Sequence, residues 1–403
     1  FLLREVFIMN NFAYCSPTKF IFGKGEENNV GQYMKELGSK KVLIVYGGKS
    51  AEKSGLLGRL RESLKGAGIE FVELGGVKPN PRYELALEGM KLSKKEGVDF
   101  ILAVGGGSAI DSAKAIGYGV ANPNNDVWDF CLKKAVPTGC LPIGVILTIA
   151  ASGSEMSSSS VITNEETKEK RGCAKTDYCR PKFAILNPRL TYTLPQYQTE
   201  SGCVDILMHT MERYFVNIET MEITDSISEA LMQTVIYNAR ILMKEPDNYS
   251  ARAEIMWAGS LSHNGLTGLG RAKDFSVHKL GHALGAKYDK AHGATLSAVW
   301  GSWAEYVYKN DEERFAHYAK KVWGVEEEDV AKAAKEGIRR TVEYFREIHM
   351  PTNLKELEIG EVSEEDLREL SMAATLNDTV KLLKIKELTA EDVYQIFRKV
   401  AEK

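Results

Sequence analysis

The sequence predicts an α/β domain with a doubly wound, mostly parallel sheet, followed by an all-helical domain. Two observations carry this prediction. Short apolar runs rich in β-branched residues alternate with amphipathic stretches through the first half of the chain, as a parallel sheet covered on both faces requires. From TLPQ (193–196) onward, a 3.6-residue period dominates instead. We therefore place a boundary near Pro195, between a first domain of residues 1–194 and a second of residues 195–403.

The elements of the first domain follow in order along the chain. Amphipathic helical stretches cover 55–67 and 83–96, and another begins at Ser108. Five runs have the length and composition of buried strands: KVLIVY (41–46), EFVEL (70–74), DFILAV (99–104), GVILT (144–148) and KFAIL (182–186). The second domain contains long amphipathic segments such as SISEALMQTVIYNARILM and DVAKAAKEGIRRTVEYFREI.

Composition narrows the functional classes. Among 403 residues, 52 basic and 55 acidic side chains leave a formal charge of −3 with no basic block, so we expect neither a nucleic acid nor a membrane as partner. The longest apolar run, LPIGVILTIA, is too short to span a bilayer, and the opening FLLREVFIMNNF lacks the unbroken apolar stretch of a signal peptide. The six cysteines form no C-x-x-C pair, which predicts reduced thiols and a cytoplasmic protein.

A glycine-rich turn follows the strand DFILAV. Gly105, Gly106 and Gly107 would let the backbone approach a ligand closely, and Ser108 would cap a helix whose free N–H groups point at the glycines. Such a helix terminus binds phosphate, and a tight strand-to-helix turn without a ligand is the alternative. The spacing is not G-x-G-x-x-G. Asp111 lies in the first turn of that helix, where a carboxylate also suits the helix dipole.

Two further loops follow predicted strands. In Gly47-Gly48-Lys49-Ser50 there is no acid that would bind the adenosine ribose and repel a 2′-phosphate, so this loop favours NADP over NAD. The loop TIAASGSEMSSSS (148–160) is small and rich in hydroxyl groups. It could contact a nicotinamide or pyrophosphate, or it could be only a mobile loop.

Histidines and one acid gather in the second half of the chain. Asp205 and His209 are four residues apart, as are His278 and His282, so each pair projects from one helix face. Together with His292, they offer the carboxylate and imidazoles that hold zinc or ferrous iron. Histidines packed on ordinary helices are the alternative. No Glu follows His278 in the H-E-x-x-H register of zinc proteases.

These motifs together carry a family resemblance. GGGSAID, TIAASGSE, NPRLTYTLP, SGCVDILMHTMERY and HKLGHALGAKYDKAHG occur in this order, from about residue 20 to past His292. They resemble the iron-containing (group III) alcohol dehydrogenases, in particular their butanol-dehydrogenase-like branch. The resemblance implies a dehydroquinate-synthase-like architecture and hydride transfer between NAD(P)(H) and a small alcohol or aldehyde such as butanol or butanal. It also implies Fe²⁺, with Zn²⁺ as a chemically reasonable substitute, and a homodimer.

The resemblance assigns expected roles to individual residues. The metal ligands would be Asp205, His209, His278 and His292, and His282 would act in catalysis as a proton relay. NADP(H) is expected in preference to NAD(H). The expected cofactor-binding residues are Gly47, Gly48, Ser50, Asn80, Gly105, Gly106, Gly107, Ser108, Asp111, Thr148, Ile149, Ser152 and Lys170. The loop departs from the family pattern at Ile149 and Ala151, where hydroxyl or glycine residues are common.

Other classes stay open at this point. A metal-dependent lyase or a polyol-phosphate dehydrogenase could share the architecture. A lyase of the dehydroquinate-synthase kind would need several basic side chains for a phosphorylated substrate, and the helices near the predicted ligands offer mainly Arg213, Arg271 and Lys279. A non-catalytic dinucleotide sensor would not need an open metal position.

Overall fold

The chain divides into two compact units. A computed structural model describes residues 9–173, 176–216, 221–272, 274–382 and 385–403. Residues 16–194 form one unit, called the α/β unit below. Residues 195–403 form the other, called the helical unit, and the described residues 9–15 group with it. The backbone N–H of Asn10, for example, donates to the carbonyl of Gly270 at 2.9 Å.

The α/β unit is built on a six-stranded sheet in which every neighbouring pair is parallel, in the order β1-β8-β5-β4-β2-β3. Its strands are β1 (Lys19–Phe22), β2 (Lys41–Tyr46), β3 (Glu70–Leu74), β4 (Phe100–Gly105), β5 (Ile143–Leu147) and β8 (Phe183–Leu186). Its helices are α1 (Val30–Glu36), α2 (Ser50–Lys53), α3 (Leu56–Gly66), α4 (Tyr83–Glu96), α5 (Gly107–Ala121) and α6 (Val127–Cys131). All five predicted strands and the predicted fold class are confirmed.

Three strands lie outside the prediction. β1 is a four-residue strand at the edge of the sheet, where it pairs with β8. β6 (Val161–Asn164) and β7 (Glu169–Gly172) form a separate antiparallel pair. Their segments are short, and EKRG in β7 is polar, so neither carries the continuous apolar run by which buried parallel strands are recognised.

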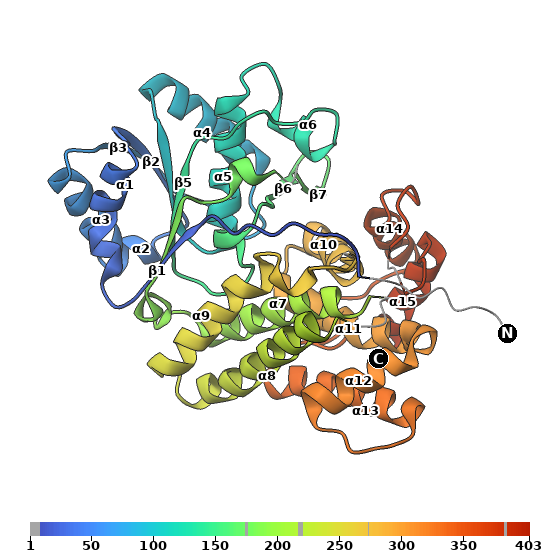
Figure 1. Cartoon of the computed structure of the whole chain (residues 1–403). Coiled ribbons are helices and arrows are strands. Elements are labelled where there is room, and N and C mark those ends of the chain that lie inside the picture. Colours follow the sequence, from blue (N-terminus) through green and yellow to red (C-terminus); the bar gives the residue numbers. More distant parts are fainter. Residues whose placement is uncertain (1–8, 174–175, 217–220, 273, 383–384) are drawn as a thin grey trace. The chain divides into compact units, whose positions relative to one another are not determined.

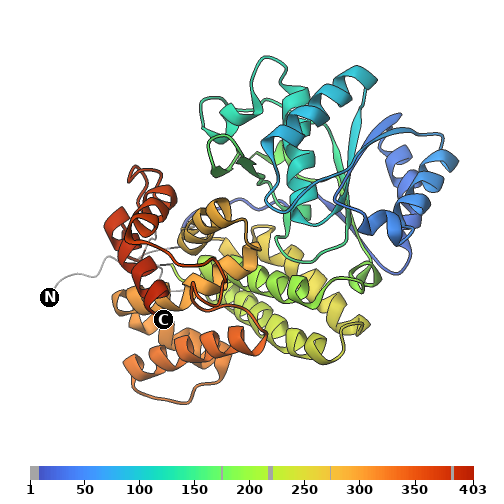
Figure 2. The same cartoon turned by 180° about the vertical axis from the view of Figure 1, so that it is seen from behind.

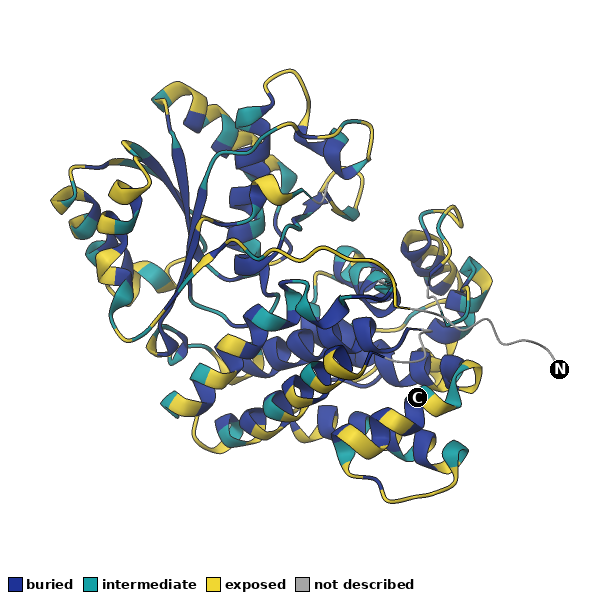
Figure 3. Cartoon of the chain, viewed as in Figure 1, coloured by how far each residue is buried: buried dark blue, intermediate teal, exposed yellow. Residues whose placement is uncertain are grey.

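Helices cover both faces of the sheet, with α1 and α3 on one face and α4 and α5 on the other (Figure 1). Alternate strand residues such as Val42, Ile44 and Leu102 join a core with the apolar side of α3. Their neighbours Leu43, Val45 and Ala103 point to the opposite face and are also fully buried. The central strands are therefore buried along nearly their whole length (Figure 3), which explains their uninterrupted hydrophobic sequences.

The helical unit contains nine α-helices among its described residues (Figures 1 and 2). They are α7 (Gln196–Tyr214), α8 (Glu222–Lys244), α9 (Tyr249–His263), α10 (Ser276–Tyr288), α11 (His292–Val307), α12 (Glu312–Trp323), α13 (Val330–Glu347), α14 (Glu364–Ala374) and α15 (Ala390–Glu402). Helix α7 is buried at every position from Thr199 to Tyr214. Within the described ranges, no helix has the length and apolar character needed to cross a membrane.

One prediction about the cysteines is wrong. Cys131, at the end of α6, and Cys173, just after β7, are joined in a disulfide. Forty-two positions separate them in the sequence, so no local spacing motif could predict the disulfide. The packing of two distant segments brings the two cysteines together. The other four cysteines, Cys15, Cys140, Cys179 and Cys203, carry free thiols as predicted.

Candidate functional site

The glycine-rich turn between β4 and α5 lies directly against the loop that follows β5. A Cβ on Gly107 would lie 2.3 Å from Ser152 Oγ, and one on Gly106 would lie 3.0 Å from Ile149 Cβ. The backbone N–H of Thr148 also donates to the carbonyl of Gly105 at 3.0 Å. Because glycine has no Cβ, these residues allow the two loops, both predicted to bind the cofactor, to lie in close contact.

The predicted cofactor residues follow neighbouring strands of the sheet. Gly47 and Gly48 follow β2, Asn80 lies between β3 and α4, and the glycine turn begins at Gly105, the last residue of β4. Because the carboxyl ends of parallel strands share one edge, these loops meet where open α/β sheets bind ligands. Lys170, on β7, donates a hydrogen bond to Asn80 Oδ1 at 2.8 Å, which links two predicted residues ninety positions apart.

Two local expectations in α5 are wrong. The helix begins at Gly107, and its N-cap is Gly106, not Ser108, which lies inside the first turn. Asp111 therefore lies beyond the first turn, and both of its carboxylate oxygens are engaged by the protein. Ser154 Oγ donates to Asp111 Oδ1 at 2.6 Å, and the backbone N–H of Val161 donates to Oδ2 at 3.0 Å.

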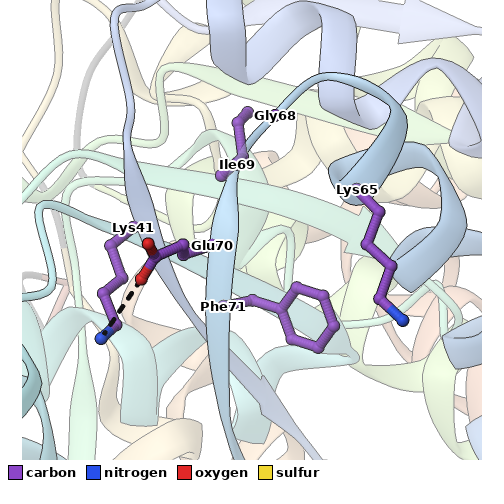
Figure 4. Close-up of a pocket in the computed structure, with 6 residues that line it drawn as sticks. All are labelled: Lys41, Lys65, Gly68, Ile69, Glu70 and Phe71. Atoms are coloured by element: carbon purple, nitrogen blue, oxygen red, sulfur yellow. Dashed lines mark ion pairs between the residues drawn. The ribbon is translucent and has the colours of Figure 1, made fainter.

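A surface hollow of about 410 Å³ lies elsewhere on the α/β unit. Lys41, Lys65, Gly68, Ile69, Glu70 and Phe71 line it, and Lys41 pairs with Glu70 across 3.6 Å (Figure 4). Lys41 and Glu70 are the first residues of β2 and β3. The hollow is thus at the amino end of the sheet, opposite to the edge where such folds bind dinucleotides.

In the helical unit, three helices bring the predicted metal ligands together. Asp205 and His209 lie on α7, His278 lies on α10, and His292 is the first residue of α11. The start of α11 packs on α7 so closely that a Cβ on Gly293 would lie 1.9 Å from the carbonyl oxygen of Ser201. Glycine after His292 therefore permits the contact that places its imidazole beside α7.

Three of the predicted ligands, all histidines, surround a carboxylate oxygen of the fourth, Asp205, although among the described residues only Asp205, His278 and His292 lie close enough to one another to form a metal-ligand group. Asp205 Oδ1 lies 3.2 Å from His209 Nδ1, 3.5 Å from His278 Nε2 and 3.7 Å from His292 Nε2. One donor atom each from Asp205, His278 and His292 lies within 4.8 Å of the other two. The His282 ring centroid is 6.0 Å from that of His278 and 5.2 Å from that of His292, so this side chain borders the same cluster.

Several of these polar atoms are buried without a hydrogen bond. Asp205 Oδ1, His209 Nδ1 and His278 Nε2 have no hydrogen-bond partner among the residues that the structure describes. Buried polar atoms are normally satisfied, and leaving one unpaired costs about 1–3 kcal/mol. Three such atoms around one point fit a bound cation, because a carboxylate oxygen and imidazole nitrogens are the donors that iron and zinc accept.

A second carboxylate orients His278. Glu212, one turn beyond His209 on α7, accepts a short hydrogen bond from His278 Nδ1 and another from the His278 backbone N–H at 3.2 Å. Burial alone would lower the pKa of His278, but the nearby carboxylates of Glu212 and Asp205 raise it to about 9. Burial, with the charges of His278 and Arg213, lowers the pKa of His209 well below its usual value. Glu212 was not among the residues predicted from the sequence, although its i,i+3 spacing from His209 was a usable signal.

The arginines near the metal-ligand cluster are bound to other groups of the helical unit. Arg213 donates to the carbonyls of His209 and Ser262, and its Nη2 lies 3.0 Å from Nδ1 of His263, whose ring touches that of His209 at 4.2 Å between centroids. Arg271 pairs with Asp225 at 2.7 Å and donates to the carbonyl of Arg213. Both guanidinium groups are buried and engaged inside the helical unit, where a phosphorylated substrate could not use them without breaking these bonds.

Comparison with known proteins extends over nearly the whole chain. Residues 17–188 match the family described as iron-containing alcohol dehydrogenase, and residues 199–401 match its C-terminal counterpart, described as Fe-containing alcohol dehydrogenase family, C-terminal. The NADH-dependent butanol dehydrogenase A of Clostridium acetobutylicum is 41% identical over 393 residues, which cover 97% of this chain and 100% of that protein.

Two further similar proteins support the same family assignment. The NADPH-dependent aldehyde reductase YqhD of Escherichia coli is 36% identical over 86% of this chain and 89% of its own length. The crystal structure of NADH-dependent butanol dehydrogenase A from Thermotoga maritima superposes with a TM-score of 0.94 at 37% identity, covering 98% of this chain and 100% of that one. The chain belongs to the iron-containing alcohol dehydrogenase family, as the motifs from GGGSAID to KAHG predicted.

Proposed function

We propose that this member of the family transfers a hydride reversibly between NAD(P)(H) and a small alcohol or aldehyde of about the size of butanol or butanal. The relatives named butanol dehydrogenase and aldehyde reductase support the substrate class. The observation that carries the proposal is the convergence of buried imidazole nitrogens on Asp205 Oδ1. It is the arrangement that a metal-dependent reaction at an alcohol or carbonyl oxygen requires.

In this proposal Asp205, His209, His278 and His292 hold Fe²⁺, for which Zn²⁺ could substitute. When bound, the cation would supply Lewis acidity toward the substrate oxygen. Glu212 accepts from Nδ1 of His278, which leaves Nε2 as the nitrogen that a cation would bind once its proton is released. His282, which borders the cluster, accepts the substrate hydroxyl proton in alcohol oxidation and returns it in aldehyde reduction.

The cofactor is proposed to lie along the loops at the carboxyl edge of the sheet. The turn at Gly105–Ser108 would bind the pyrophosphate at the N-terminus of α5, with Thr148, Ile149 and Ser152 beside it. Gly47, Gly48 and Ser50 would lie at the adenosine end, and Asn80 and Lys170 would act as one hydrogen-bonded pair. Asp111 would act through the loop that it holds, since both of its oxygens are already engaged.

Preference for NADP(H) over NAD(H) is part of the proposal. Gly48, Lys49 and Ser50 are exposed after β2, and a Cβ on Gly48 would meet no atom within 4 Å, so the loop has room for a 2′-phosphate. The family does not decide the matter, because it contains relatives named as NADH-dependent and as NADPH-dependent. The absence of a repelling acid in this loop is the argument from this chain itself.

The alternative functions are less well supported. A lyase or polyol-phosphate dehydrogenase needs free cationic groups, and Arg213 and Arg271 are bound within the fold. A dinucleotide sensor would gain nothing from three unsatisfied buried polar atoms, which cost stability unless something binds them. A homodimer and a cytoplasmic location also remain predictions, and light scattering of the purified chain tests the first of them.

The decisive experiment follows NADPH and NADH consumption with a panel of aldehydes that includes butanal, after loading the chain with Fe²⁺ or Zn²⁺. We expect turnover only in metal-loaded protein, with higher kcat/KM for NADPH. His278→Ala should lose the metal and the activity while keeping most of its helical content. Full activity of metal-free protein would overturn the proposal.

A further inference from the structure

Lys114 is the one lysine that is completely buried among the described residues of the chain. It lies on α5, one turn after Asp111, and has 0% of its surface exposed. A lysine is almost never found in such a position unless its charge is compensated. The compensation comes from the serine-rich segment that follows the cofactor loop.

This segment surrounds the ammonium group. Lys114 Nζ lies 2.7 Å from Ser154 O, 2.9 Å from Ser154 Oγ, 3.0 Å from Ser157 O, 3.3 Å from Ser157 Oγ and 2.8 Å from Ser159 O. An ammonium group has only three protons, so these five oxygens share them. Three of the acceptors are backbone carbonyls, and the path of the chain from Ser154 to Ser159 is therefore shaped around this one charge.

Asp111 holds the same segment from the neighbouring turn of α5. Its carboxylate accepts from Ser154 Oγ at 2.6 Å and from the backbone N–H of Val161 at 3.0 Å, so it binds the segment at both ends. Ser154 connects the two charges, because its hydroxyl oxygen accepts from Lys114 and its proton goes to Asp111. Two opposite charges on one helix thus fix a loop that has little apolar surface of its own.

The held segment continues directly from the predicted cofactor loop. Gly153 separates Ser154 from Ser152, and Ser152 lies against Gly107 at the start of α5, where the pyrophosphate is proposed to bind. Ser152 Oγ also accepts from the backbone N–H of Ser154 at 3.3 Å. A change in the path of Ser154 would therefore move the side of the loop that faces the proposed cofactor.

We infer that Lys114 is a positioning residue for the dinucleotide site: with Asp111, it holds residues 152–160 in the path that places Thr148–Ser152 beside the glycine turn. This inference rests on the proposed function, because it assumes that the turn and the loop bind NAD(P)(H). Lys114 itself is completely covered by protein, so its effect on a bound cofactor would be indirect. Lys114 would affect the reaction by setting the fraction of protein molecules whose loop is in the conformation that binds the cofactor.

The test is the dissociation constant of NADPH and NADH, measured by fluorescence in metal-loaded wild type and in Lys114→Met, which keeps the length of the side chain and removes its charge. We expect the constant to rise about tenfold or more, because three carbonyls lose their donor and the competent loop path becomes a minor population. Metal content and kcat at saturating cofactor should stay within about threefold of wild type, since the ligands lie in the other unit.

Matched variants separate the possible outcomes. Ser112→Ala is the control: its hydroxyl is buried on the same helix and has no hydrogen-bond partner among the described residues, so cofactor affinity should not change. Ser154→Ala removes only the bridging hydroxyl and decides the question if Lys114→Met does not fold; it should also weaken cofactor binding. Unchanged affinity in the folded variant would overturn the inference. Wild-type protein that binds neither cofactor would overturn the proposed function, and this inference with it.

Discussion

Glu212 offers the sharpest test of the metal cluster, because it lies beside the predicted ligands without being one. Its carboxylate accepts two hydrogen bonds from His278, one from the ring Nδ1 and one from the backbone N–H. In Glu212→Gln the side chain keeps its shape but has one acceptor oxygen and an NH₂ group that faces a donor. One of the two bonds must therefore be lost, and the negative charge that makes the imidazole a better ligand is lost with it.

The expected effect can be sized. Removing the hydrogen-bond partner of a metal-bound histidine typically weakens metal affinity by about 10–100-fold, which is about 1.4–2.7 kcal/mol. Glu212→Gln should fall in this range, whereas His278→Ala, which removes a ligand, should lose far more. The measurement is competition for Zn²⁺ or Co²⁺ against a chelator of known affinity, with the melting temperature of each metal-free variant measured beside it.

The control is Glu229→Gln. Glu229 is also a buried carboxylate of the helical unit, but it accepts from Tyr214 Oη at 2.7 Å and from His317 at 2.9 Å, not from a predicted ligand. This variant should lose stability by about 1–3 kcal/mol and keep its metal affinity. A Glu212→Gln protein that binds metal within about twofold of wild type would refute the idea that the carboxylate orients His278.

Four further predictions concern other parts of the chain. Gly48→Asp should shift the kcat/KM ratio from NADPH toward NADH, because the carboxylate repels a 2′-phosphate and accepts from ribose hydroxyls; higher kcat/KM for NADH in the wild type would contradict the premise. Gly293→Ala should both destabilise the protein by about 1–3 kcal/mol and weaken metal binding, since its Cβ would lie 1.9 Å from a backbone oxygen of α7, and calorimetry with metal titration measures both. His282→Ala should retain metal and cofactor while kcat falls by up to about 10²–10⁴-fold, and an unchanged pH–rate profile would reduce His282 to a packing role. Thiol titration of the unreduced, denatured chain should find four reactive cysteines, rising to six after reduction, and six at the outset would mean that Cys131 and Cys173 are not joined.

The sequence allowed much of the fold to be predicted because its main signals are local. KVLIVY and DFILAV are uninterrupted apolar runs, as strands buried on both faces must be. The i,i+4 pairs on α7 and α10 likewise showed that Asp205 and His209, and His278 and His282, share a helix face. The edge strand β1 was missed because pairing with the distant β8, not its local composition, makes it a strand. The antiparallel pair β6–β7 was missed because its segments are short and β7 is polar, without an apolar run.

The sequence did not show which charged side chains are buried and paired inside the fold. Arg213 and Arg271 were weighed as contacts for a phosphorylated substrate because they lie near the predicted ligands in the sequence, yet both are buried in bonds to backbone carbonyls and Asp225. Lys114 would be counted as a solvated helix residue from its hydropathy, although it organises a whole segment. Hydropathy describes a side chain alone, whereas burial of a charge depends on partners that the fold supplies from elsewhere. Such groups are recognised only once their acceptors are located. The buried polar groups of this chain therefore fall into two sets. The charges of the first set are paired within the protein. The atoms around Asp205 Oδ1 form the second set, and because they have no hydrogen-bond partner among the described residues, they mark where a cation should bind.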